Sequence, residues 1–241
     1  RQAIINSNLN PGPDEIVFEE GLSGTIFLNL GSMFIQDDLT INGPGAERVT
    51  IDADGKSSIF DVNDFDNGIN RVVEIRGLRL INADGVFGLV GNIEILTVKS
   101  CEFINGKAEI GGAILNFNIL TVDSCLFENN SASFGGGAIN NDDEGARLII
   151  RNSEFVDNQA GISGAGAIAN AFGIIELITN STFANNNATG EGSSGGAILN
   201  FLGTIKEISH STFEANTAII AGGAIFNSEG IIKKIVNSTF T

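Results

Sequence analysis

The 241-residue sequence has little positive charge and lacks two of the side chains that build many binding sites. It contains 13 Lys and Arg against 29 Asp and Glu, which gives a formal net charge of −16 at pH 7. Nucleic acids and anionic membrane surfaces require basic patches, so this charge argues against both as partners. The sequence also has no Trp and no Tyr. Because these amphipathic rings usually stack on sugars, their absence weakens a lectin or glycosidase interpretation.

Cysteine and long apolar runs are also scarce. Two Cys residues do not make a disulfide framework, so stability must come from packing. No stretch reaches the roughly 18 apolar residues of a transmembrane helix, so we expect no membrane insertion by this segment. With 42% hydrophobic residues, the chain is too apolar to be disordered. It begins at Arg1 rather than Met, so we expect that any targeting signal was removed or lies upstream, and that the sequence is a fragment of a longer chain.

The sequence contains a strict internal repeat. The pattern Gly-Ala-Ile-x-Asn occurs five times at intervals of 25 to 30 residues, at 112–116, 137–141, 166–170, 196–200 and 223–227. A Phe closes the apolar run before each copy, and a sixth Phe opens a further turn: Phe103, Phe127, Phe155, Phe183, Phe213 and Phe240. Leu80 fits the same place one repeat earlier, and four copies continue as Phe-x-x-Asn. Apolar and polar residues alternate before each Phe, which is typical of a half-buried strand.

A repeat of this length with strand periodicity cannot bury its own apolar face, whereas stacked copies can. The sequence therefore predicts an all-β fold, a right-handed three-sheet parallel β-helix (solenoid) of about 9 coils with equivalent residues about 4.8 Å apart. The Asn residues at the corners are expected to hydrogen-bond from coil to coil. We expect a single domain over 1–241, with irregular N-terminal coils and a candidate cap in 1–70 and regular repeats in 71–241. A helix starting near Gln2 is limited to about two turns by the proline after Asn10.

A polar residue stands three positions before each Phe, where the inward-facing phase of the strand shifts. Asn and His are among the residues that best tolerate a left-handed backbone, so this column predicts a bend. The single histidine lies in it, which favours a corner residue over a general base. The members are Ser100, Ser124, Asn152, Asn180, His210 and Asn237.

The Gly-Gly-Ala-Ile and Phe-x-x-Asn tetrapeptides that alternate through residues 103–227 resemble the repeats of polymorphic outer-membrane protein passengers, a family of autotransporter adhesins. The first third, with Gly24-Thr25-Ile26 and residues 38–46, resembles the opening coils of large secreted bacterial proteins with pectate-lyase-like repeats. The resemblance implies a right-handed three-sheet β-helix and an extracellular or cell-surface location. Its motifs specify coils, which host many functions.

Metal and thiol chemistry have few candidate residues. Asp61, Asp64 and Asp66 are candidate calcium ligands, and solvated turn carboxylates are the alternative, because Phe65 falls where a calcium loop needs a ligand. No other cofactor is expected. Cys101 and Cys125 occupy one column in adjacent coils. Two stacked thiols are favoured there over a disulfide, although the expected separation also permits a disulfide.

The repeats favour a non-enzymatic segment that acts as a structural stalk or an adhesin-like passenger. Its partner would be an unknown surface ligand or a matrix polysaccharide or protein. The last coil, which contains Ile235 and Phe240, would expose an apolar cross-section, so end-to-end self-association is also expected.

The alternative function is a carbohydrate-active enzyme of the pectate-lyase-like class, a polysaccharide lyase or hydrolase. Its site would lie in the longer coils between the second and fifth Phe of the column, with Arg147, Arg151 and Asp157 as the candidate residues. The acidic run 142–144 has no neighbouring base and is interpreted as an exposed loop.

Overall fold

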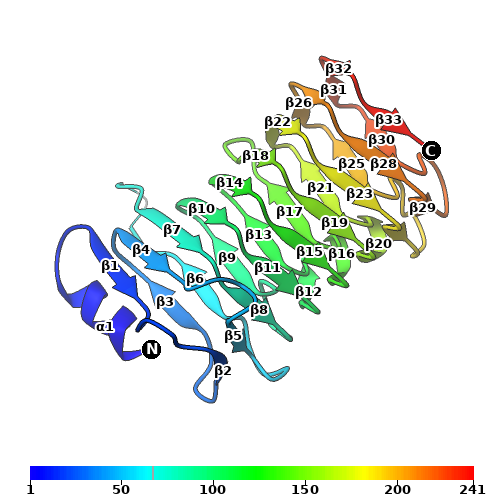
Figure 1. Cartoon of the computed structure of the whole chain (residues 1–241). Coiled ribbons are helices and arrows are strands. Elements are labelled where there is room, and N and C mark those ends of the chain that lie inside the picture. Colours follow the sequence, from blue (N-terminus) through cyan, green and yellow to red (C-terminus); the bar gives the residue numbers. More distant parts are fainter. Residues whose placement is uncertain (67) are drawn as a thin grey trace.

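The computed structural model describes residues 1–66 and 68–241, and it is an all-β parallel solenoid of about 8 turns. Figure 1 shows the strands stacked along one long axis, with the N-terminus and the C-terminus at opposite ends. Equivalent strands of successive turns pair in parallel and in register; for example, Phe103 lies opposite Phe127, and Leu80 lies opposite Phe103. The predicted fold class is confirmed.

The two largest sheets form two faces of the solenoid. Sheet A contains β1 (Asp14–Val17), β4 (Leu39–Asn42), β7 (Val72–Arg76), β10 (Ile95–Lys99), β14 (Ile119–Asp123), β18 (Arg147–Arg151), β22 (Ile174–Thr179), β26 (Thr204–Ile205), β27 (Ile208–Ser209), β31 (Ile231–Ile232) and β32 (Ile235–Val236). Sheet B contains β2 (Gly24–Phe27), β5 (Val49–Asp52), β8 (Arg79–Ile81), β11 (Glu102–Ile104), β15 (Leu126–Glu128), β19 (Glu154–Val156), β23 (Thr182–Ala184), β28 (Thr212–Glu214) and β33 (Thr239–Phe240).

The third face is sheet C, whose two sections are linked by a hydrogen bond from the Val90 amide to the Ala113 carbonyl (2.9 Å). It contains β3 (Met33–Ile35), β6 (Phe60–Val62), β9 (Val90–Asn92), β13 (Ile114–Asn116), β17 (Ile139–Asp142), β21 (Ile168–Ala171), β25 (Ile198–Phe201) and β30 (Ile225–Ser228). A fourth sheet, D, was not predicted. It contains β12 (Lys107–Ile110), β16 (Ser131–Gly136), β20 (Gln159–Ala165), β24 (Asn187–Ala188) and β29 (Thr217–Ala218).

The Phe column forms a continuous stack inside the solenoid. The rings of the six Phe residues from Phe103 to Phe240 are nearly parallel, with centroids 4.6 to 4.8 Å apart. Offset stacking of this kind adds to the stabilisation from area burial. Phe103 to Phe213 are fully buried, so the Phe column carries much of the apolar core.

Asparagines, most of them buried, connect the coils at two corners. In the first ladder, each side-chain amide donates to the oxygen of the next Asn at 2.6 to 2.7 Å, through Asn92, Asn116, Asn141, Asn170, Asn200 and Asn227. In the second ladder the distances are 2.9 to 3.0 Å, through Asn130, Asn158, Asn186 and Asn216. The predicted coil-to-coil hydrogen bonds are therefore present, and Asn92 extends the first ladder one coil beyond the recognised repeat.

The polar column before each Phe adopts the expected left-handed backbone. All six members have φ between 50° and 57°, including His210 at 51°. His210 is exposed, and its Nε2 lies 3.1 Å from the Asn237 amide nitrogen. These observations confirm its interpretation as a corner residue.

At the N-terminal end, α1 (Gln2–Leu9) is the two-turn helix that the following proline allows. It contacts β1 and β3, and Ile4 joins the buried core. Part of the apolar surface of the first coil is thereby covered.

Candidate functional site

A groove runs along the outer corner where sheets C and D meet, and we call it the corner groove. Its volume is about 500 Å³, and its lining extends over successive coils from β12 to β30. The floor comes from the variable position of Gly-Ala-Ile-x-Asn, which points outward because its neighbours point inward. In register along the floor lie Asn140, Ala169, Leu199 and Phe226. The side wall is formed mainly by Phe134 of β16 and Ser163 of β20.

Glycines at the end of β16 allow the wall to approach the floor closely. The register between β16 and β20 shifts between Phe134 and Gly136, and Gly135 adopts φ of 71°. The Gly136 amide then donates to the Asn140 side-chain oxygen at 3.2 Å. A side chain at Gly136 would collide with the backbone of β17. The Gly-Gly-Gly run therefore sets the angle between sheets C and D, and with it the shape of the groove.

The opposite rim of the groove is a turn with a left-handed backbone after each of the last four strands of sheet C, β17, β21, β25 and β30. The residue in this turn has positive φ in four successive coils: Asp143, Phe172, Leu202 and Glu229. Bulky side chains are uncommon in this region and cost of order 1 kcal/mol or more. Phe172 and Leu202 are nevertheless 44% and 43% exposed. Phe172 also packs edge-on against Phe201 of the groove, with centroids 5.8 Å apart.

The corner has several acidic side chains and few basic ones. The segments of sheets C and D around it are residues 107–117, 131–144, 159–173, 187–203 and 217–230, in which Lys107 is the single cation. They contain six acidic residues: Glu109, Asp142, Asp143, Glu144, Glu191 and Glu229. Partial burial, together with the neighbouring Asp143, raises the pKa of Asp142. Asp142 lines the groove and is half-buried, which corrects the interpretation of 142–144 as a wholly exposed loop.

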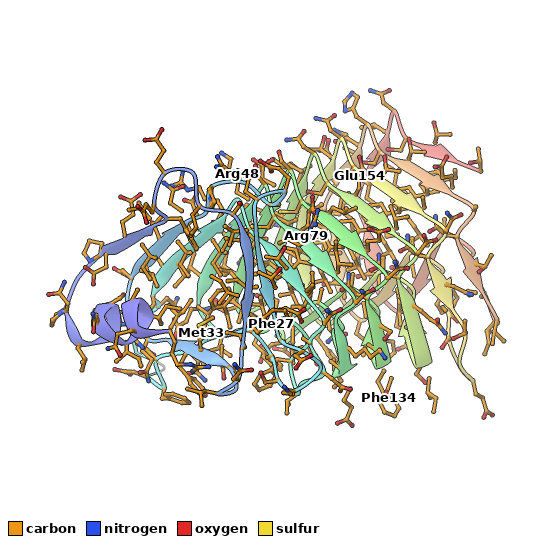
Figure 2. The ribbon with its side chains drawn as sticks, turned by 60° about the horizontal axis from the view of Figure 1, so that its bottom comes forward. Phe27, Met33, Arg48, Arg79, Phe134 and Glu154 are labelled. Carbon is orange, nitrogen blue, oxygen red and sulfur yellow. The ribbon has the colours of Figure 1, made fainter. Side chains whose placement is uncertain are left out.

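Figure 2 shows how this corner lies relative to sheet B. Phe134 extends from the lower edge of the ribbon, whereas Glu154 of sheet B lies near the upper edge. Most cations belong to sheets A and B or the turns beside them, where they pair with acids, as Arg79 does with Glu102 at 2.6 Å. The corner groove is therefore apolar, and the segments around it have few cations to pair with their acids.

Of the calcium candidates, Asp61 belongs to β6, and Asp64 and Asp66 lie in the turn after it. Burial raises the pKa of Asp61. For Asp64, burial acts in the same direction, but hydrogen bonds, including one from Arg71 Nε at 2.7 Å, hold its pKa below the ordinary value. Asp66 accepts a hydrogen bond from the Gly68 amide at 2.9 Å. Within 1–66 and 68–241, no group of three or more His, Cys, Asp or Glu side chains is arranged to hold a metal ion. Calcium binding by this turn stays a prediction.

Arg71 instead links three coils near the N-terminal end. Besides Asp64, its guanidinium contacts Asp37 at 3.0 Å, and its backbone amide donates to Glu94 at 2.8 Å. Glu94 is 2% exposed, and burial raises its pKa. This cluster could not be predicted from the repeat, because its members belong to no repeated column. We assign it a structural role.

The structure does not bring the enzyme candidates together. Arg147 and Arg151 lie at opposite ends of β18 in sheet A, and Arg147 pairs with Glu176. Asp157 is exposed in a turn after β19 of sheet B. The geometry therefore supplies no joint site for these three residues.

Both cysteines are free and buried in the interior column that Ser occupies in later coils. Burial raises the pKa of Cys101 to about 11 and raises that of Cys125 further. A thiol at such a pKa is unreactive at neutral pH. The structure thus has the stacked thiols rather than the disulfide.

Comparison with known proteins agrees with this architecture. Residues 124–142, which run from the bend before Phe127 to Asp142 in the groove, match the Chlamydia polymorphic membrane protein repeat. No curated protein and no solved structure matches the chain. Across the described residues, no helix has the length and apolarity needed to cross a membrane. Fold and repeat together show that the chain is a parallel β-helix repeat protein that resembles the polymorphic membrane protein passengers.

Proposed function

We propose that the chain is a non-enzymatic, adhesin-like β-helix passenger, exposed outside the cell or at its surface, that binds its partner through the corner groove. The matched repeat indicates a surface-exposed passenger. The observation that carries the binding role is the groove itself. It exposes apolar side chains, such as Phe134 and Phe201, at 40% and 37%, and exposed apolar patches of this kind commonly mark interaction sites.

The remaining architecture supports a rigid scaffold. Two of the side chains that could carry chemistry, His210 and Arg147, have structural partners. The Phe stack and the Asn ladders fix the position of each coil relative to the next. A rod of this kind holds a binding surface at a constant geometry.

Bead adhesion tests this function. The purified chain, coupled to latex beads, is applied to epithelial monolayers and to surfaces coated with fibronectin or collagen. Beads coupled to a variant with the groove blocked, Ala171→Trp, are the control, because Ala171 lines the groove and is half-buried. Adhesion that falls with this variant supports the proposal, and equal adhesion of both bead types contradicts it. In parallel, the chain is incubated with polygalacturonate and other polysaccharides, where release of unsaturated or reducing ends would show an enzyme instead.

A further inference from the structure

We propose that the corner groove binds a basic amphipathic α-helix of a partner protein, with its apolar face on the groove floor and its Lys or Arg side chains at the acidic rim. The inference rests on the proposed binding function and specifies the partner's chemistry. Three observations carry it: the shape of the floor, the spacing of the coils and the charge of the rim.

The floor offers a hollow between larger side chains. Ala169 and Ala171 belong to the same strand, β21, and both line the groove. Along the solenoid, Asn140 precedes Ala169 and Leu199 follows it. A small residue between larger neighbours leaves a hole that an inserted side chain can fill, as in knobs-into-holes packing. The hollow therefore suits an apolar anchor projecting from the partner.

The coil spacing selects a helix over an extended strand that runs along the groove. Neighbouring coils are 4.6 to 4.8 Å apart, measured between the stacked Phe rings. A helix presents one face every 5.4 Å or so, so its turns shift against the coils by less than about 1 Å per coil and by about 3 Å over four coil intervals. A strand repeats its face about every 6.7 Å, so its side chains shift by about 2 Å per coil and by about 8 Å over the same length. Since four coil intervals span about 19 Å, the matching helix has about 13 residues.

The charge of the rim favours a basic partner. Six acidic side chains and one Lys belong to the segments around the groove. Asp142 lines the groove itself and is half-buried without a salt-bridge partner among the described residues. A Lys or Arg of the bound helix forms the salt bridge that Asp142 lacks. Opposite charges on the two surfaces also steer their encounter. An acidic or neutral helix gains neither effect.

A designed helical peptide tests the proposal directly. The probe is a fluorescein-labelled 14-residue peptide of Leu and Lys with all Leu on one helical face. Three peptides serve as comparisons: a scramble of the same composition, a version with Glu for every Lys, and oligolysine. Binding to the full chain is measured by fluorescence anisotropy at 150 mM salt. We expect the amphipathic basic peptide to bind at least about tenfold more tightly than each comparison peptide.

Two variants locate the binding, each with a matched control on sheet B. Ala171→Trp fills the hollow, and we expect it to weaken binding about tenfold, whereas Thr182→Trp on the outer face of sheet B leaves binding unchanged. Asp142→Asn is expected to weaken binding about threefold, whereas Glu154→Gln has no effect. Circular dichroism confirms that each variant keeps its β structure.

Several outcomes overturn the proposal. Equal binding of the scrambled peptide or oligolysine would show attraction by net charge alone, and unchanged binding by Ala171→Trp would place the peptide elsewhere. No binding of the amphipathic peptide up to 1 mM would also refute it. If beads still adhere to cells and lose adhesion with Ala171→Trp while the peptide does not bind, the helix proposal fails and the proposed function stands. If neither beads nor peptide bind, both fail.

Discussion

Replacing Asn158 by Ala tests whether the buried Asn ladder holds the coils together. Asn158 is fully buried, and its side chain takes part in four hydrogen bonds. Its Nδ2 donates to the Phe127 carbonyl at 3.0 Å and to Asn186 Oδ1 at 2.9 Å. Its Oδ1 accepts from the backbone amide and from Nδ2 of Asn130, both at 3.0 Å. Alanine removes all four bonds and nothing nearby replaces them.

The expected loss follows from the groups left without this partner. Asn186 Oδ1 still accepts from the Asn158 backbone amide at 3.1 Å. The Asn130 amide, Asn130 Nδ2 and the Phe127 carbonyl each lose a bond in the interior. At about 1 kcal/mol each, the low end of the usual range because water can enter the space, the free energy of unfolding falls by about 3 kcal/mol.

Urea denaturation followed by far-UV circular dichroism measures this change, because the chain has no Trp or Tyr to report by fluorescence. Asn187→Ala is the matched control: Asn187 is exposed in the next strand and accepts one hydrogen bond, from Thr217. We expect the control to change the free energy of unfolding by about 0.5 kcal/mol or less. Equal effects of the two substitutions would refute the view that the ladder stabilises the stack.

Three further predictions concern other columns and the Arg71 cluster. Phe183→Ala removes a ring stacked at 4.7 Å on both sides and should cost about 3 to 5 kcal/mol in urea denaturation, whereas His210→Asn should be nearly silent. Cys125→Ser places a residue of the later coils in the same column, so we expect the free energy of unfolding to change by less than about 1.5 kcal/mol in urea denaturation. Because both thiols are free, a reductant should leave the urea midpoint of the parent unchanged, and a fall would indicate a disulfide. Burial raises the pKa of Glu94, so the folded state binds its proton more tightly and this carboxyl's contribution to stability falls as pH rises above about 4.5. Glu94→Gln should therefore show a flatter dependence of the urea midpoint on pH between 5 and 7 than the parent, and parallel profiles would contradict the assignment.

Repetition explains which parts of the structure were predictable from the sequence. The Phe column, the Asn ladders and the bend that contains His210 each recur in successive coils. The residue types found at one position in several coils together indicate whether that position is buried, exposed or at a corner. The Arg71 cluster occurs once, and its contacts to Asp37 and Asp64 span residues with no shared register. Sheet D was missed because its two longest strands, β16 and β20, are rich in Gly and Ser, which favour turns when judged alone.

The groove could not be predicted from the sequence, for a related physical reason. Its floor is the one position of Gly-Ala-Ile-x-Asn that varies, from Asn140 to Ala169 to Leu199, since side chains that point outward are not constrained by the interior. The residues on either side of that position are fixed by the core and the Asn ladder. A substitution on the floor therefore changes the shape and polarity of the corner without disturbing the stack that supports it. The same coil that needs strict repetition inside can alter its binding surface one residue at a time, as expected of a passenger whose partner is selected by the outer face.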